Sequence, residues 1–185
     1  MKVLVIGKGG REHALAHAVS RSGRVKKIYA APGNPGMAEL AECVNIADSD
    51  VKGLTAFAKE QEIDLTIVGP EATLSLGIVD AFQAEGLKIF GPTKDAAQVE
   101  SSKDFAKKIM AKYGIPTASY QTFDNKADAI GYVEHQGVPI VIKEDGLKAG
   151  KGVTVAYELK EALDAIEIAF SVPGNVLYRG MPGGL

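Results

Sequence analysis

The stretch Lys143-Glu144-Asp145-Gly146-Leu147-Lys148-Ala149-Gly150-Lys151-Gly152 decides how the second half of this chain is interpreted. One apolar run, Val138 to Ile142, precedes it and another, Val153 to Ala156, follows it, which predicts a strand, a loop and a strand. Glycines let backbone N–H groups approach an anion and lysines supply charge, so this loop suits phosphate binding. It is not a Walker A motif, which requires Ser or Thr where Gly152 stands. The alternative is a hairpin with a basic, solvated tip.

Composition bounds the class of protein. The chain has 185 residues, of which 46% are apolar, so it is long enough for one large domain or two small ones. Its formal net charge of −2 disfavours a nucleic-acid-binding surface. Cys43 is the single cysteine, so no disulfide can form within the chain and a reducing, cytoplasmic location is expected. The sequence shows no signal peptide, no apolar run of membrane-spanning length and hence no expected membrane partner.

Residues 1–100 alternate between strand and helix patterns, which predicts an α/β domain with a doubly wound parallel sheet. Short apolar runs rich in β-branched residues indicate buried strands. The predicted strands are Lys2–Ile6, Val25–Ala30, Val44–Ile46, Leu65–Val68 and Leu87–Phe90. The predicted helices run to about Ser22 after the first strand, and then over Val51–Gln61 and Gly77–Glu85.

The glycine-rich segment after the first strand, Gly7–His13, is similar to a dinucleotide-binding fingerprint but departs from it twice. The pattern G-x-G-x-x-G requires a third glycine where Glu12 stands, and residues 29–33 hold no acid to bind a ribose. NAD binding is therefore disfavoured. Backbone N–H groups at a helix N-terminus still favour an anion, which makes Gly9, Gly10 and Arg11 a candidate phosphate site. The alternative is a tight turn with Arg11 on the surface.

Two further loops are expected at the same edge of the sheet, because ligands of open α/β sheets lie beyond the carboxyl ends of the strands. These loops are Pro32–Asn34 and Gly69–Glu71. Glu71 is a candidate for binding an amine or a sugar hydroxyl, and capping the next helix is its alternative role. Asn34 is equally suited to a helix cap and to a ligand contact.

Residues 101–172 are predicted to form a second, α+β unit. A helix over Lys94–Val99 precedes it, and its own elements are helix Ser101–Tyr113, strand Ala118–Thr122, helix Lys126–His135, the two strands around the opening stretch, and helix Glu158–Phe170. Lys103 falls in the first turn of a helix, where a cation opposes the helix dipole, and this weakly indicates an anionic ligand rather than a solvated lysine. Residues 173–185 show no helix or strand period and are interpreted as a tail.

Seven short motifs occur in an order that resembles one enzyme family. They are Gly7–His13, Pro32–Asn34, Gly69–Glu71, Gly91–Thr93, Glu100–Lys107, Val141–Lys143 and Asp145–Gly152. Together they resemble glycinamide ribonucleotide synthetase, the phosphoribosylamine–glycine ligase family of ATP-grasp enzymes in de novo purine synthesis. The second unit resembles the first subdomain of an ATP-grasp fold. No single motif is specific, but their order is.

The resemblance implies ATP-dependent ligation of glycine to phosphoribosylamine through an acyl phosphate, with Mg²⁺ or Mn²⁺ as metal cofactor. By position it implies that ATP is bound by Lys103, Lys143, Gly146, Lys148, Gly150, Lys151 and Gly152. The implied phosphoribosylamine-binding residues are Gly9, Gly10, Arg11, Asn34 and Glu71. No catalytic residue is identified within this chain, and the metal ligands are expected outside it.

Two departures from the family pattern affect the expected site. The family usually has a small residue where Lys148 stands, and an extra cation there either strengthens phosphate attraction or hinders loop closure. The family also usually has proline where Thr73 stands, which affects the local turn. The alternatives are another ATP-grasp ligase or biotin-dependent carboxylase subunit, and a nucleotide- or phosphosugar-binding module without turnover. The Gly9–His13 segment argues against the first alternative.

The family's chains are more than twice as long as this one, so the chain by itself is expected to lack ligase activity. Near the end, the family has an apolar strand followed by Ile-Glu-Glu, whereas this chain has Tyr178-Arg179-Gly180. A one-nucleotide insertion after the Leu177 codon reproduces that difference and is one hypothesis. A natural short protein or a deliberately chosen end is the alternative.

Overall fold

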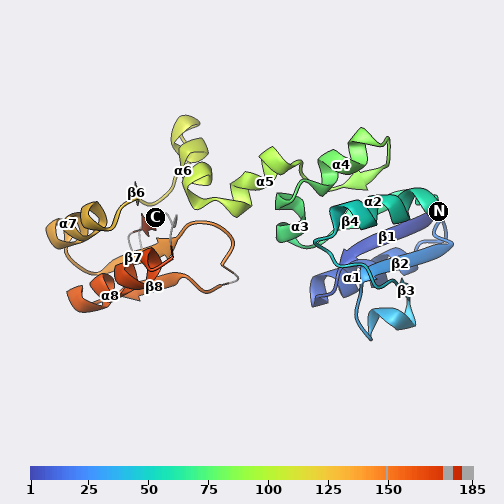
Figure 1. The fold of residues 1–185 in the computed structure, drawn as a ribbon, viewed down its shortest axis with the longest axis horizontal. Helices are drawn as coiled ribbons and strands as arrows, with labels where there is room; N and C mark the ends of the chain where they lie inside the picture. The colour runs from blue at the N-terminus through green and yellow to red at the C-terminus, as the bar shows by residue number, and fades with distance from the viewer. Residues whose placement is uncertain (149, 173–176, 181–185) are drawn as a thin grey trace. The chain divides into compact units, whose positions relative to one another are not determined.

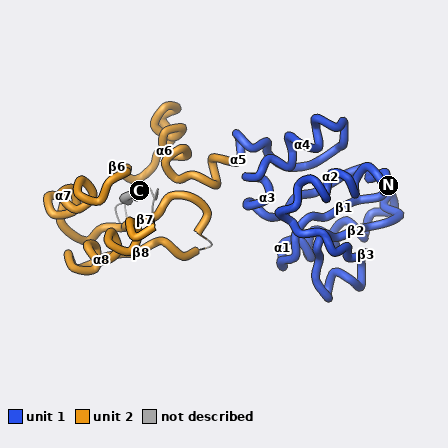
Figure 2. Tube along the Cα trace, viewed as in Figure 1, with its two compact units in different colours: residues 1–97 blue, residues 98–185 orange. Residues whose placement is uncertain are grey.

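The computed structural model describes residues 1–148, 150–172 and 177–180. The chain forms two compact units, residues 1–97 and 98–185, which Figure 2 distinguishes by colour. Helix α5 (Lys94–Ser101) contains the boundary between them. Among the described residues, no helix combines the length and the apolar character that crossing a membrane requires.

The first unit is built on a five-stranded parallel sheet in the order β3-β2-β1-β4-β5. The strands are β1 (Lys2–Gly7), β2 (Lys27–Pro32), β3 (Glu42–Cys43), β4 (Leu65–Val68) and β5 (Ile89–Phe90). Strand β1 is central and is buried on both faces, which explains its continuous apolar run. The predicted doubly wound α/β fold is confirmed. The predicted strand Val44–Ile46 is wrong, because β3 ends at Cys43, directly before it, and β2 extends to Pro32.

Helices cover both faces of this sheet (Figure 1). Helix α1 (Gly10–Ser20) and the short 3-10 helix η1 (Met37–Glu39) pack on one face, over Val3, Val5, Ile28 and Ala30. Helices α2 (Val51–Glu60) and α4 (Ile78–Ala84) pack on the other face, over Leu4, Ile6, Tyr29, Ala31 and Val68. The sequence analysis missed α3 (Glu71–Ser75), which begins directly after the Gly69–Pro70 turn.

The second unit carries a four-stranded sheet in the order β6-β9-β7-β8. Its elements are α6 (Lys103–Lys112), β6 (Tyr120–Phe123), α7 (Lys126–Gln136), β7 (Ile140–Glu144), β8 (Val153–Ala156), α8 (Leu159–Phe170) and β9 (Leu177–Gly180). Residues of α7 and α8 pack against Ile140, Ile142 and Ala156 on one face of the sheet. The predicted order of helices and strands in this unit is confirmed up to α8.

The interpretation of residues 173–185 as a tail without strand structure is wrong for β9. This strand pairs antiparallel with β6 on one side and with β7 on the other, four residue pairs on each side. Ladder hydrogen bonds join backbone groups, so a strand can form without the side-chain alternation that sequence analysis searches for. Residues 173–176 and 181–185 lie outside the described part of the chain.

Candidate functional site

The first candidate site lies at the carboxyl ends of β1, β2 and β4. Sheet order reverses between β1 and β4, and such a switch point is where open α/β sheets bind ligands. Backbone hydrogen bonds join the three loops to one another, from Gly33 N to Gly7 O at 3.2 Å and from Gly69 N to Ile6 O at 3.1 Å. The structure therefore brings together the loops that were predicted to share this edge. We call residues 7–13 the first loop.

Arg11 joins the first loop to the loop after β4. Its Nη1 donates to the carbonyl oxygen of Gly69 at 2.7 Å and to Oε2 of Glu71 at 3.1 Å. The pKa of the Glu71 carboxyl is lowered, first by a hydrogen bond from its own backbone N–H and then by the Arg11 side chain. Glu71 is the first residue of α3 and the N-cap is Pro70, so Glu71 does not occupy the capping position, and its lowered pKa keeps the carboxylate ionised at neutral pH.

Glu12 is a functional candidate that the sequence analysis noticed only as a departure from a motif. It is 5% exposed, and its Oε2 accepts a hydrogen bond from Gly9 N at 2.7 Å. Its Oε1 lies 4.0 Å from Nε of Arg11. The missing third glycine was the signal, because a side chain at that position has to occupy the space that glycine usually leaves between helix and strand.

Asn34 and the glycines of the first loop are placed differently from each other. Asn34 Nδ2 donates to Lys8 O at 2.9 Å, and its Oδ1 accepts from Met37 N at 2.9 Å, so its amide joins two loops. Gly9 and Gly10 are exposed at the amino end of α1. A Cβ added to Gly10 would meet no atom within 4 Å, so the space above this helix end is open.

The second candidate site is built on residues 143–152, which we call the second loop. Its Asp145 reaches the amino end of α6, where Oδ1 accepts from Lys103 N at 2.5 Å and from Asp104 N at 3.4 Å. Ser102, the N-cap of α6, donates its hydroxyl to Asp145 Oδ2 at 3.0 Å. Lys103 Nζ donates to Gly146 O at 2.9 Å. The structure thus brings Lys103 to the second loop, across 43 residues of sequence.

The remaining predicted residues of the second loop lie on or beside its two strands. Lys148 forms an ion pair with Glu144 at 2.7 Å, and Glu144 N donates to Gly152 O at 2.8 Å. Glycine is required at Gly146, Gly150 and Gly152, since all three adopt positive φ angles between 78° and 83°. Lys143 is on β7, opposite Val153 of β8, and Lys151 N donates to Lys148 O at 2.9 Å.

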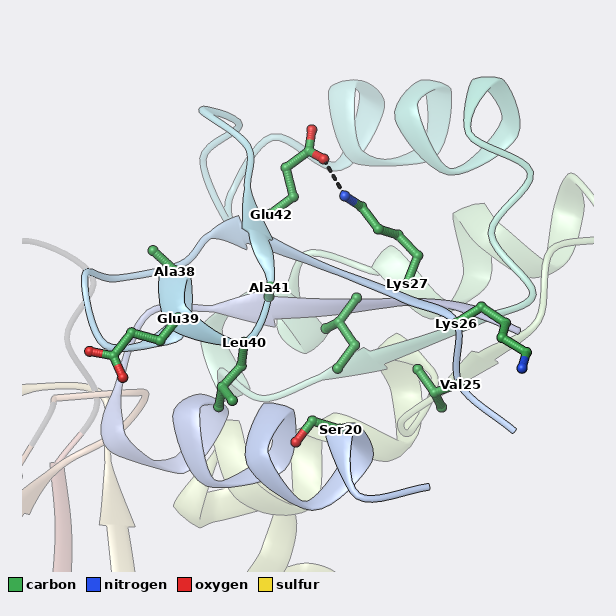
Figure 3. Close-up of a pocket in the computed structure, with 10 residues that line it drawn as sticks. Ser20, Val25, Lys26, Lys27, Ala38, Glu39, Leu40, Ala41 and Glu42 are labelled. Atoms are coloured by element: carbon green, nitrogen blue, oxygen red, sulfur yellow. Dashed lines mark ion pairs between the residues drawn. The ribbon is translucent and has the colours of Figure 1, made fainter. Parts of the chain in front are cut away.

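Two surface hollows lie away from these loops. One, of about 540 Å³, is lined by the start of β2 and by residues 38–42, where Lys27 pairs with Glu42 at 2.6 Å (Figure 3). The other, of about 570 Å³, lies beside β6 and includes Asp104 and Lys108, which pair at 2.6 Å. In each hollow these two charged groups pair with each other, and neither hollow contains a residue predicted for the site.

A metal ion is implied by the ATP-grasp resemblance, and the available donors were compared with what it needs. Mg²⁺ takes oxygen ligands, usually one or two carboxylates with water and phosphate oxygens. In residues 1–148, 150–172 and 177–180, no three His, Cys, Asp or Glu side chains gather as a metal-binding group. No chemical step is therefore assigned to a metal ion.

Comparison with known proteins gives two matching family models in sequence order. Residues 1–100 match the N domain of phosphoribosylglycinamide synthetase, and residues 101–175 match its ATP-grasp (A) domain. The chain is 57% identical over 168 residues to the phosphoribosylamine–glycine ligase of Ralstonia nicotianae. That alignment covers 91% of this chain and 40% of the relative, so the chain spans about two fifths of that relative's length.

Solved structures show the same fold. The phosphoribosylamine–glycine ligase of Thermotoga maritima superposes with a TM-score of 0.78 at 27% identity, covering all of this chain and 45% of the relative. An ADP complex of an N5-carboxyaminoimidazole ribonucleotide synthetase superposes with a TM-score of 0.79 at 17% identity, covering 97% of this chain and 46% of that one. At that identity the second likeness concerns the fold alone.

Proposed function

This chain belongs to the phosphoribosylglycinamide synthetase family, and from that premise we propose that it carries the phosphoribosylamine-binding loops and part of the ATP-binding surface of a phosphoribosylamine–glycine ligase. The setting is purine biosynthesis in the cytoplasm. The observation that carries the proposal is that, within each unit, residues implied by the resemblance converge on one set of loops. Arg11 and Glu71 meet in the first unit, and Lys103 meets the second loop in the second unit.

The reaction consists of two transfers. ATP gives its terminal phosphoryl group to the glycine carboxylate, which yields an acyl phosphate and ADP. The amine of phosphoribosylamine then attacks the acyl carbon, an amide bond forms and phosphate leaves. Several anions approach one another in both steps, so the protein has to hold them with cations and backbone N–H groups.

In the second unit, we assign the nucleotide phosphates to the lysines and glycines around the second loop. These residues are Lys103, Lys143, Gly146, Lys148, Gly150, Lys151 and Gly152. The contact from Lys103 to Gly146 O keeps one cation beside a glycine-rich backbone, which is the combination that phosphate binding uses. Lys148 is held by Glu144, so its charge reaches a phosphate only if that ion pair opens.

In the first unit, we assign phosphoribosylamine to the loops that contain Gly9, Gly10, Arg11, Asn34 and Glu71. The open space above Gly10 lies at a helix N-terminus, which favours the phosphate group of this substrate. The ionised Glu71 carboxylate can accept a hydrogen bond from an amine or from a ribose hydroxyl. Asn34 supports the site, because both ends of its amide are bonded within the protein.

Turnover is not expected from these 185 residues by themselves. The chain spans about two fifths of the length of its Ralstonia nicotianae relative, and no catalytic residue is identified in it. A phosphate-release assay with ATP, glycine and phosphoribosylamine checks this expectation. Release at the rate of a longer relative would contradict it.

The binding proposal is tested by calorimetric titration of the chain with ATP, ADP and adenosine. We expect ATP to bind more tightly than adenosine. Lys103→Ala should lower the affinity for ATP by about tenfold, because a charge-assisted contact to phosphate is lost. Lys160→Ala is the matched control, since Lys160 is an exposed lysine on α8. Equal affinity for ATP and adenosine, or equal loss in the two variants, would overturn the assignment.

A further inference from the structure

We propose that Glu12 is a positioning residue whose buried carboxylate holds the first loop and residues 69–71 in register and fixes Arg11 between them. The inference rests on the proposed function of these loops as the phosphoribosylamine site. Glu12 itself is 5% exposed, so it acts on a ligand through its neighbours.

The Glu12 side chain lies against three glycines from two loops. A Cβ built on Gly69 would lie 2.1 Å from Glu12 Oε1, and one built on Gly7 would lie 2.5 Å from its Cγ. A Cβ on Gly9 would lie 2.8 Å from Oε2. These distances are too short for real atoms, so glycine at all three positions leaves the space that the glutamate fills. This explains why Gly7, Gly9 and Gly69 are glycines although they lie on two separate segments.

Burying a carboxylate is costly unless hydrogen bonds and opposite charge compensate for lost water. Here the Gly9 N–H donates to Oε2 at 2.7 Å, and the Arg11 guanidinium lies 4.0 Å from Oε1. The same guanidinium donates to Gly69 O at 2.7 Å. Glu12 therefore contacts the first loop through a hydrogen bond, Arg11 through charge and Gly69 through packing, and a change in its side chain should be felt in both loops.

Glu12 determines which hydrogen-bond donors of the first loop remain available to a ligand. Gly9 N is occupied by Glu12, so the first loop is left to meet an anion through the exposed residues that follow it, Gly10 and Arg11. Arg11 also forms an ion pair with Glu71, with Nη1 3.1 Å from Oε2. Glu12 thus sets the spacing between the helix end proposed for the phosphate and the carboxylate proposed for the amine.

Three variants separate positioning by the carboxylate from simple filling of space. Glu12→Met keeps a long side chain without an acceptor, whereas Glu12→Gln keeps an oxygen that can accept from Gly9 N. Gly69→Ala leaves Glu12 intact but places a methyl group in its space. Gly23→Ala is the matched control, because a Cβ at Gly23 meets no atom within 4 Å.

The readouts are backbone amide shifts and exchange rates by NMR, and the affinity for ribose 5-phosphate. We expect Glu12→Met to shift the amide signals of Gly9 and of residues 69–71 together. The affinity for ribose 5-phosphate should fall by about tenfold, because the charge-assisted hydrogen bond from Gly9 N is lost. Glu12→Gln should be closer to wild type in both respects. Gly69→Ala, although it lies in the loop after β4, should shift the amide signal of Gly9 in the first loop. Gly23→Ala should leave that signal unchanged.

Two results would overturn the proposal. One is a Glu12→Met effect confined to residues 7–13, and the other is displacement of both loops with ribose 5-phosphate binding unchanged. Failure of the wild-type chain to bind ribose 5-phosphate would instead count against the proposed substrate site, and the amide signals would still decide whether Glu12 joins the loops. If Glu12→Met does not fold, Glu12→Gln and Gly69→Ala carry the test.

Discussion

The two glycine-rich loops of this chain are both held by a carboxylate, but the carboxylates act over different distances. In the first loop, Glu12 accepts from Gly9 N, three residues away, and is buried. In the second loop, Asp145 accepts from Lys103 N, 42 residues away, and is only partly buried. The Glu12 carboxylate is therefore hydrogen-bonded within its own loop, and Arg11 connects that loop to Gly69, whereas the Asp145 carboxylate is hydrogen-bonded to the start of α6.

The sheets that carry the loops differ in the same sense. In the first unit, β1 is central and every strand falls within residues 2–90. In the second unit, β6 and β7 are joined only through β9, which spans Leu177–Gly180. Order in the second loop should consequently be lost more easily than order in the first.

The largest effect is expected from removing residues 173–185, which include β9. Strand β6 then loses its pairing partner and β7 loses one of two, so the second unit should lose its cooperative unfolding transition. The first unit should keep its own. Hydrogen exchange measured by mass spectrometry should show loss of protection in β6, β7 and α6 and unchanged protection in β1 and β4.

Removing only residues 181–185 is the control for this deletion. It leaves β9 in place, and protection of β6 should remain as in the full chain. Equal loss from both deletions would mean that β9 is not what stabilises the sheet. Loss of protection in β1 would mean that the two units do not unfold separately.

A smaller effect is expected from Asp145→Ala, which removes the acceptor for three donors at the start of α6. By analogy with lost helix caps, the second unit should lose about 1–2 kcal/mol of its free energy of unfolding. Asp145→Asn keeps an acceptor oxygen and should lose less. Urea denaturation measures both, and Asp164→Ala on the exposed side of α8 is the control. An Asp145→Ala loss no greater than that of the control would contradict the anchoring role.

The sequence predicts most of this fold because local signals and tertiary structure agree in it. Strands β4 and β8 have the predicted bounds, since each is a short apolar run bordered by turn residues. Helix α6 lies within the predicted helix Ser101–Tyr113, with Ser102 as its N-cap. Strand β9 and helix α3 were missed, because β9 is defined by backbone pairing with strands far away in sequence and α3 is only five residues long.

The candidate site is predictable in its residue types but not in its contacts. The carboxyl-edge rule predicts that Arg11 and Glu71 share an edge, and their contact at 3.1 Å is a feature that only coordinates supply. The ion pair of Lys148 with Glu144 follows from side-chain rotamers, which no motif encodes. The role of Glu12 was hidden because the fingerprint treats that position as a missing glycine.

A gain of stability is expected in the first unit from Thr66→Val. The Thr66 hydroxyl is buried in β4 and, among the described residues, has no hydrogen-bond partner. Valine has a similar shape without a polar atom, so the free energy of unfolding should rise by about 1 kcal/mol. Thr55→Val is the matched control and should give no gain, because the Thr55 hydroxyl donates to Val51 O. A rise in the free energy of unfolding of the first unit alone would support this prediction and show that the two units unfold separately. A fall in that free energy would contradict the prediction.

The smallest effect concerns the charged contact between Arg11 and Glu71, which joins two loops of the first unit. The pKa of the Glu71 carboxyl is lowered, first by its own backbone N–H and then by the hydrogen bond and charge of Arg11. Arg11→Met removes both contributions of Arg11 but leaves the backbone hydrogen bond, so the pKa should rise and still remain below its usual value. Carboxyl-carbon NMR titration measures it.

The sign of the linked pH effect follows from that depressed pKa. A carboxylate with a lowered folded-state pKa stabilises the fold above its unfolded pKa, and the stabilisation fades as pH falls through the folded value. In Arg11→Met the gap between the folded and unfolded pKa values is narrower, so Glu71 stabilises the fold less at neutral pH and its contribution is fully lost at a higher pH. The difference in thermal stability between wild type and variant should therefore be largest near neutral pH and shrink on acidification. Glu85, whose pKa is lowered by Lys59, is the internal control and should titrate unchanged. An unmoved Glu71 pKa would mean that Arg11 does not hold this carboxylate in solution, and the first loop would then be joined to residues 69–71 by Glu12 packing and the Gly69 carbonyl alone.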